Sequence, residues 1–194
     1  MGAGRIRLGA AFGLAAVVWF LALYSVAMTQ DSEYEFGENY LSDLGVREGA
    51  WAFNAGVIVA GALFLAFDVL AVKSILGTRL LDTVALIVLM VGAVFLMLVG
   101  IFTEDAGDLH GIVSYGFFLS MLVALGLVSE RLYRSKHLGR TGLIATLVVF
   151  VIGLSLLTMG GTPLSETIAV MGILAWGSVI SAVILLKEKG FRIP

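Results

Sequence analysis

The sequence predicts an all-α membrane protein, a bundle of six transmembrane helices, and two observations lead to this fold class. First, 60% of the 194 residues are hydrophobic and only 13% are charged, against about 45–50% and about 25% in soluble domains. Second, the apolar residues form six runs of about 20 residues, the length that a helix needs to cross a bilayer core about 30 Å thick. We therefore expect a single integral membrane domain over residues 1–194.

Charged residues, Gly or Pro separate the six predicted spans. The spans cover residues 8–29, 51–72, 82–102, 109–129, 141–159 and 165–186. The first run follows Arg5 and Arg7, as the apolar region of a signal peptide would, but it is longer than the roughly 7–15 residues of such a region. We interpret it as an uncleaved span. Asp82 fits the N-terminus of the third span, and Pro163 fits the first turn of the sixth.

Basic residues are distributed very unevenly between alternate loops. Eleven of the twelve Lys and Arg residues fall on one side of the predicted bilayer, namely Arg5, Arg7, Lys73, Arg79, Arg131, Arg134, Lys136, Arg140, Lys187, Lys189 and Arg192. Only Arg47 falls on the other side, together with ten of the fourteen acidic residues. Because loops rich in Lys and Arg stay in the cytoplasm, we predict a multi-pass protein of the cell membrane with cytoplasmic N- and C-termini.

The composition argues against several classes of function. The absence of cysteine excludes disulfides, thiolate metal sites and thiol nucleophiles, and a net charge of -2 gives no indication of a nucleic-acid partner. His110 and His137 fall on opposite sides of the predicted bilayer, which argues against a haem held by two histidines. Ionisable groups are almost absent from the middles of the spans, with Asp68 near a cytoplasmic end, so a charge-moving transporter is not indicated.

The longest loop, residues 30–50, is expected to contain a short amphipathic helix at the outer membrane interface. Its apolar stripe consists of Phe36, Tyr40, Leu41 and Leu44, at spacings i, i+4, i+5 and i+8. Gly45 suits the C-terminal cap of this helix. Asn39, Ser42 and Asp43 would lie on its opposite side.

Polar side chains from several predicted helices reach the same outer level as this loop. The candidate ligand-binding residues are Asn39, Ser42, Asp43, Asn54, His110 and Ser114. His110 and Ser114 are spaced i, i+4 and therefore share a helix face. Asp43, Asp108 and His110 supply carboxylates and an imidazole, the ligands of zinc or another divalent metal ion, although their spacing matches no metal motif.

Ordinary structural roles also explain part of this polar cluster. Glu104 and Asp105 are interpreted as a solvated acidic face. Asp108 and Glu166 are interpreted as residues that stabilise helix N-termini. The amide of Asn54 needs hydrogen-bond partners, and its role could be limited to packing the second span against the loop.

Short motifs at these positions resemble a known family. They are Asn39-Tyr40-Leu41-Ser42-Asp43-Leu44-Gly45, Phe53-Asn54-Ala55-Gly56, and Gly100-Ile101-Phe102 leading to Leu109-His110. With six spans in the same order, nearly the whole chain is similar to the archaeal and bacterial membrane family catalogued as domain of unknown function 998. The resemblance implies that Ser42, Asp43, Asn54 and His110 occupy polar positions of that family, whereas Thr103 stands where members often carry Pro. The family name implies no assigned activity.

Three classes of function agree with these observations. The leading hypothesis is a polytopic membrane protein that binds a small ligand or lipid headgroup in a polar pocket open to the outer leaflet. The first alternative is a metal-assisted hydrolase or transferase acting on lipids, with His110 and Asp43 as metal ligands or base and Ser42 as nucleophile. The second is a structural or assembly subunit of a membrane complex. The expected partners are the lipid bilayer and a lipid or small-molecule ligand; the sequence names no cofactor and no oligomeric state.

Overall fold

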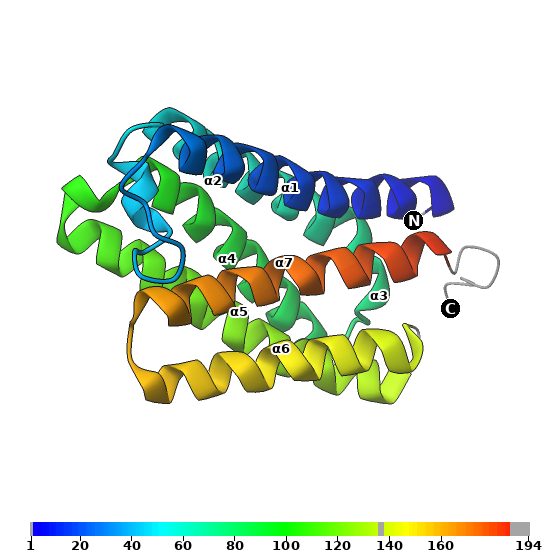
Figure 1. Cartoon of the computed structure of the whole chain (residues 1–194). Coiled ribbons are helices and arrows are strands. Elements are labelled where there is room, and N and C mark those ends of the chain that lie inside the picture. The colour runs from blue at the N-terminus through cyan, green and yellow to red at the C-terminus, as the bar shows by residue number, and fades with distance from the viewer. Residues whose placement is uncertain (1, 136–137, 187–194) are drawn as a thin grey trace.

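The computed structural model of the chain describes residues 2–135 and 138–186. Within these residues six helices are long enough and apolar enough to cross a membrane (Figure 1). They are α1 (Ala3–Gln30), α2 (Ala50–Phe67), α4 (Leu80–Ile101), α5 (Asp108–Ser135), α6 (Gly139–Met159) and α7 (Pro163–Leu186). The predicted all-α fold with six membrane spans is confirmed. His137 and four basic residues used for the orientation, Lys136, Lys187, Lys189 and Arg192, lie outside the described residues.

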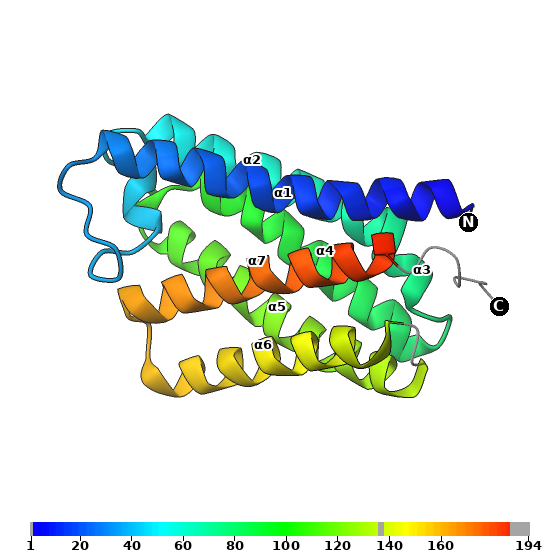
Figure 2. The same cartoon turned by 45° about the vertical axis from the view of Figure 1, so that its right-hand side comes forward.

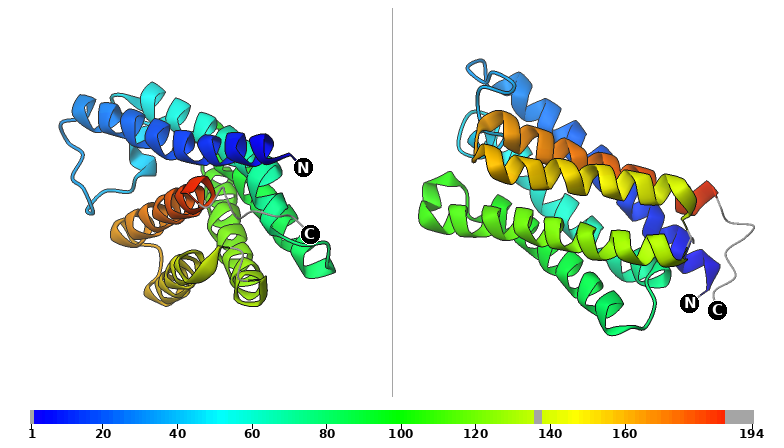
Figure 3. Two further views of the ribbon diagram at one scale, coloured as in Figure 1. Left: turned by 90° about the vertical axis from the view of Figure 1, so that its right-hand side faces the viewer. Right: turned by 90° about the horizontal axis from the view of Figure 1, so that it is seen from below.

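The second span is extended beyond α2 by a π-helical stretch, η2 (Asp68–Val72), and by the short helix α3 (Lys73–Ile75). Neighbouring spans pack against each other in chain order, and α7 also packs against α1, which closes the bundle (Figure 3). Because the number of spans is even, α1 begins and α7 ends at the same end of the bundle (Figure 1). We call this the terminal end and the opposite one, formed by residues 31–49, 103–107 and 160–162, the loop end.

Helices in a membrane gain no hydrophobic free energy by associating, because lipid tails are as apolar as the helix side chains. They associate through close van der Waals packing, and small residues allow their backbones to approach closely. Gly61 shows this for α2 and α4, since a Cβ at this position would lie 2.6 Å from Met97 Cγ and 2.9 Å from the carbonyl oxygen of Ala93. In contrast, α6 is the span least covered by its neighbours. Among the described helices it contacts only α5 and α7 extensively, and this arrangement leaves room between the three helices.

Charged side chains tie α4 to α5 at the terminal end. Asp82, only 2% exposed, accepts hydrogen bonds from Arg79 Nη2 at 2.8 Å and Arg79 Nε at 3.0 Å. Arg79 also bonds Glu130 of α5, which pairs in turn with Arg134. Asp82 is the third residue of α4 and accepts the backbone N–H of Arg79 at 3.2 Å, so it stabilises the helix start from within the first turn.

The structure does not confirm the short amphipathic helix in the first loop. Residues 31–49 form turns and a single 3-10 turn, η1 (Ser42–Gly45). Gly37 adopts a left-handed conformation with φ of 85°, and the side chain of Asn39 accepts the backbone N–H of Glu35 at 2.8 Å. Side-chain bonds of this kind compete with the backbone bonds of a helix, which explains why the apolar spacing does not produce one.

The apolar residues of this loop have different environments and do not form one stripe. Leu41 and Leu44 are buried in a core at the loop end, whereas Phe36 is 57% exposed. Gly45 was predicted to form the C-terminal cap of the amphipathic helix, but it does not have the left-handed conformation of such a cap. It is the last residue of η1, and it allows close approach, because a Cβ there would lie 2.8 Å from Asn54 Oδ1.

Candidate functional site

A cavity of about 530 Å³ lies between α5, α6 and α7 and is partly open to the surroundings. We call it the three-helix cavity. At the loop end its lining is polar and includes Ser42, Glu104, His110, Ser114, Ser165 and Glu166. Farther along the helices its lining is apolar and includes Phe118, Met121, Leu122, Leu125, Val149 and Ile173. Along α5 it extends from His110 to Leu125, about 22 Å at 1.5 Å per residue.

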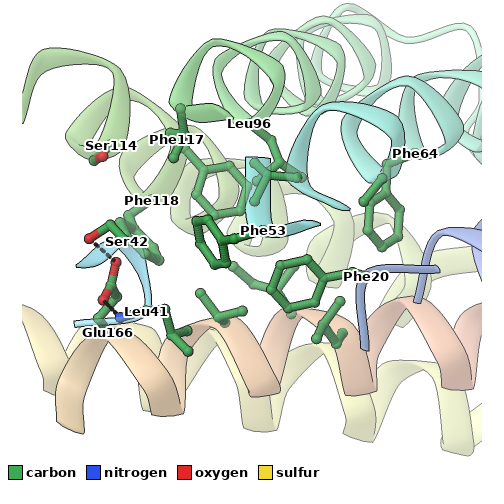
Figure 4. Close-up of a pocket in the computed structure, with 16 residues that line it drawn as sticks. Phe20, Leu41, Ser42, Phe53, Phe64, Leu96, Ser114, Phe117, Phe118 and Glu166 are labelled. Atoms are coloured by element: carbon green, nitrogen blue, oxygen red, sulfur yellow. Dashed lines mark hydrogen bonds between the residues drawn. The ribbon is translucent and has the colours of Figure 1, made fainter. Parts of the chain in front are cut away.

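A smaller cavity of about 50 Å³ adjoins the polar part. Figure 4 shows that Ser42, Ser114 and Glu166 lie on one side of its lining and that the ring of Phe53 lies between them and Phe20. Ser42, Ser114 and Phe118 line both cavities. The polar groups therefore lie between a small aromatic space inside the bundle and the larger space bordered by α6.

Glu166 connects the first loop to the start of α7. Its carboxylate accepts the backbone N–H of Leu41 at 2.7 Å and the hydroxyl of Ser42 at 3.3 Å (Figure 4). Nearby, the hydroxyl of Tyr40 donates to the carbonyl oxygen of Gly161 at 2.7 Å. These contacts hold residues 40–42 against the α6–α7 turn (Figure 2), and they place Ser42 at the polar wall of the cavity.

His110 and Ser114 form a hydrogen-bonded pair on one face of α5. His110 Nδ1 lies 2.8 Å from the carbonyl oxygen of Phe102, and its Nε2 lies 3.3 Å from Ser114 Oγ. Because a carbonyl oxygen can only accept, Nδ1 must carry the hydrogen and donate it. In the neutral ring Nε2 then has a free lone pair, which accepts the Ser114 hydroxyl.

The polar end of the cavity is acidic. The pKa of the Glu104 carboxyl is raised above its usual value, first by burial and then by the neighbouring Asp43 carboxyl, while the Ser42 hydroxyl and the charge of His110 act in the opposite direction. Arg47 pairs with Asp31 and with Asp43, at 3.7 Å in each case, so its charge is already engaged. Carboxyl oxygens and hydroxyls thus dominate this end.

The structure brings some of the predicted site residues together and separates others. Ser42, His110 and Ser114 line the three-helix cavity. Asp43 raises the pKa of the Glu104 carboxyl and accepts a hydrogen bond from the backbone N–H of Tyr40 at 3.0 Å. Asn39 bonds the loop backbone.

Asn54 lies outside the cavity lining and holds the loop. Its Nδ2 donates to the carbonyl oxygen of Gly45 at 2.9 Å, and its Oδ1 is buried without a hydrogen-bond partner among the residues that the structure describes. The structural alternative considered for this amide, packing of the second span against the loop, agrees with this contact.

A metal site is not evident in residues 2–135 and 138–186, where no three His, Asp or Glu side chains are grouped so that they could hold a metal ion. Asp108 is the first residue of α5, and its side chain is exposed. The set of Asp43, Asp108 and His110 therefore stays a prediction from the sequence.

Comparison with known proteins supports the family resemblance. A family model described as "Protein of unknown function (DUF998)" matches residues 14–186, which is most of the chain. The chain belongs to this family. Searches of curated proteins and of solved structures found no match. Within this DUF998 protein, two of the resembling polar positions, Ser42 and His110, line the cavity, and Asn54 holds the loop.

Sequence reasoning missed two acidic residues of the cavity. Glu104 was interpreted as part of a solvated face and Glu166 as a helix-dipole residue, yet both line the polar end. The signal for Glu166 was its place in the first turn of a span, three residues after Pro163. A carboxylate at that depth requires hydrogen-bond donors, and the donors come from Leu41 and Ser42 of the first loop.

Proposed function

We propose that this DUF998 protein binds an amphiphile in the three-helix cavity, with the polar head at the loop end and the hydrocarbon tail between α5, α6 and α7. The observation that supports this function is the division of the lining into a polar end and a long apolar part. The volume of about 530 Å³ falls in the range of about 300–1,000 Å³ that is typical of ligand pockets.

The tail alone cannot provide selectivity. Lipid tails are as apolar as the leucines of the cavity, so moving a tail from the bilayer into it gains little hydrophobic free energy. Hydrogen bonds to the head and the shape of the cavity must therefore select the ligand. Tail burial fixes the orientation of the ligand, because the apolar part of the cavity extends in one direction from Ser114 along α5.

The preferred head carries hydrogen-bond donors and no net negative charge. Glu104 and Glu166 supply carboxyl oxygens at the polar end, and a phosphate group without a compensating cation would be repelled by them. Hydroxyl groups or an ammonium group would be attracted. We therefore expect a lipid with a polyol or amine head, such as a glycosylated diacylglycerol or an aminolipid.

The location proposed for this cavity is the outer leaflet of the cell membrane. Among the described residues, seven basic side chains lie toward the terminal end, namely Arg5, Arg7, Lys73, Arg79, Arg131, Arg134 and Arg140, and Arg47 lies at the loop end. This asymmetry supports cytoplasmic termini. Ligands would then enter from the outer leaflet, beside the poorly covered α6.

Native mass spectrometry after incubation with mixed vesicles tests this proposal. The vesicles contain phosphatidylethanolamine, phosphatidylglycerol and a glycosyl diacylglycerol in equal parts. We expect a one-to-one adduct enriched in the aminolipid or the glycolipid. Ala169→Trp fills the apolar part of the cavity and should remove the adduct, whereas Val151→Trp, on the exposed side of α6 and outside the lining, should retain it. Equal lipid occupancy in all three proteins, or enrichment of phosphatidylglycerol, would contradict the proposal.

A further inference from the structure

We infer that Ser114 and His110 are a nucleophile and its base, and that they transfer the acyl group of an ester-linked lipid held in the three-helix cavity. This inference rests on the proposed amphiphile-binding function. It assigns the reacting hydroxyl to Ser114, whereas the sequence had pointed to Ser42.

The first support is the chain of hydrogen bonds around His110. The carbonyl oxygen of Phe102 holds Nδ1–H at 2.8 Å, and Nε2 faces Ser114 Oγ at 3.3 Å. A nucleophile bonded to a base that a third group orients is the arrangement found in serine acyltransferases and hydrolases, and the distance from nucleophile to base is often slightly long before substrate binds. Here a backbone carbonyl serves as the third group.

The second support is that the hydroxyl of Ser114 has an unusual partner for a membrane helix. Other span hydroxyls bond the carbonyl one turn earlier, as Ser25, Thr146, Ser155 and Ser178 do, which is the common way to satisfy such a group. Ser114 Oγ instead contacts an imidazole nitrogen that can take its proton. The same hydroxyl lines the cavity in which an acyl lipid would lie.

The third support is the place of Ser114 along the cavity. His110, Ser114 and Phe118 follow each other at intervals of four residues, about 6 Å each along α5, and all three line the cavity. Ser114 therefore lies where the polar lining gives way to the apolar lining. In an acyl lipid this boundary is the position of the ester bond, between head and tail.

Glu104 lines the same polar end of the cavity. Its carboxyl interacts electrostatically with His110, and in its ionised form it would stabilise the imidazolium that forms when the ring accepts a proton. Ser42 is in a different situation, because it donates to the carboxylate of Glu166 and has no imidazole partner in the hydrogen bonds of the described residues. The control hydroxyl is Ser155 of α6, which donates to the carbonyl oxygen of Val151 and lies outside the cavity lining.

The reaction has two balanced halves. Ser114 Oγ attacks the ester carbonyl carbon and its proton passes to His110 Nε2; the ester C–O bond breaks, and His110 returns the proton to the departing alcohol oxygen. Water, or the hydroxyl of an acceptor lipid, then attacks the acyl-serine. Its proton passes through His110 Nε2 to Ser114 Oγ, which releases the fatty acid or the new ester and regenerates the starting pair.

Labelling with a biotinylated fluorophosphonate, followed by peptide mass spectrometry of the full chain in detergent, tests the pair. We expect the adduct on Ser114 in the wild type and in Ser155→Ala, and no adduct in Ser114→Ala. His110→Gln can still donate to the Phe102 carbonyl but is a poor base, so its labelling rate should fall at least about 100-fold. Size-exclusion profiles and melting curves verify that each variant is folded. The inference would be refuted if the folded wild type were not labelled, or if His110→Gln were labelled at the wild-type rate.

A second measurement separates this inference from the proposed function. Ala169→Trp should lower the rate of p-nitrophenyl palmitate hydrolysis relative to that of p-nitrophenyl acetate, because only the long acyl chain needs the apolar part of the cavity, and Val151→Trp should leave this ratio at the wild-type value. A selective lipid adduct without labelling of Ser114 would overturn the inference and leave lipid binding intact. Labelling of Ser114 in a protein that binds no lipid would support the pair and overturn the binding proposal.

Discussion

Leu44→Ala is expected to destabilise the protein far more than Phe36→Ala, although the sequence placed both residues in one apolar stripe. Leu44 is 0% exposed and Phe36 is 57% exposed. Leu44 lies in a loop outside the spans, so unfolding exposes it to water, and three missing carbon atoms cost about 2.4 kcal/mol at about 0.8 kcal/mol each. The unfilled space raises the total to about 3 kcal/mol. For Phe36→Ala we expect about 0.5 kcal/mol or less, as for most surface substitutions.

Thermal melting in one detergent measures this difference. At about 2–4 °C per kcal/mol for a chain of this length, Leu44→Ala should lower Tm by about 6–12 °C and Phe36→Ala by about 2 °C or less. Lipid-facing variants such as Val151→Ala provide a reference for detergent effects. Equal losses for Leu44→Ala and Phe36→Ala would mean that the loop presents one apolar face, as an amphipathic helix would, and the described packing of the loop would be wrong.

Three further predictions concern other parts of the bundle. Burial and a neighbouring carboxyl raise the pKa of Glu104, so its stabilising contribution is complete below the unfolded pKa of about 4.3 and is lost as the pH rises through the folded pKa. Glu104→Gln should therefore flatten the fall of Tm that begins as the pH rises above about 4.3, and an unchanged curve would contradict this. Asp82→Asn should lower Tm more than Glu130→Gln, because Asp82 is buried and Glu130 is at the surface; the reverse order would argue against the ion-pair geometry. Since the chain has no cysteine, Gly161→Cys in intact cells should react with a membrane-impermeant maleimide and Thr78→Cys should not, and the opposite result would reverse the orientation.

The six spans could be predicted from the sequence because membrane insertion depends on local composition. A run of about 20 apolar residues is stable in lipid whatever its neighbours are, so each span was found independently, with the largest difference at the end of α5, where the prediction stopped at residue 129 and the helix ends at Ser135. Pro163 begins α7 as predicted, because proline fits the first turn of a helix. The family was also recognisable from short motifs, and the match over residues 14–186 confirms it.

The cavity could not be predicted, because in a membrane the hydrophobic pattern does not mark the interior. Both the lipid-facing and the inward faces of a span are apolar, so the sequence did not indicate that α6 would leave space beside α5 and α7. Glu166 and Ser42 are 124 residues apart, and only the packing of the loop against α7 brings them together. The pairing of His110 with Ser114 was the exception, because a spacing of four residues on one helix is local information.

The first loop shows the same division between local and tertiary information. The spacing of Phe36, Leu41 and Leu44 predicted an amphipathic helix, but hydrogen bonds from local side chains compete with one. Of these residues only the two leucines are buried in the core at the loop end. The amide of Asn54 was predicted to need a hydrogen-bond partner because it lies within a span. Only the fold shows that this partner is the carbonyl oxygen of Gly45. The sequence thus determined which segments enter the membrane, since transfer free energy is additive along the chain. Tertiary packing decided which polar groups meet, because that depends on contacts between distant segments.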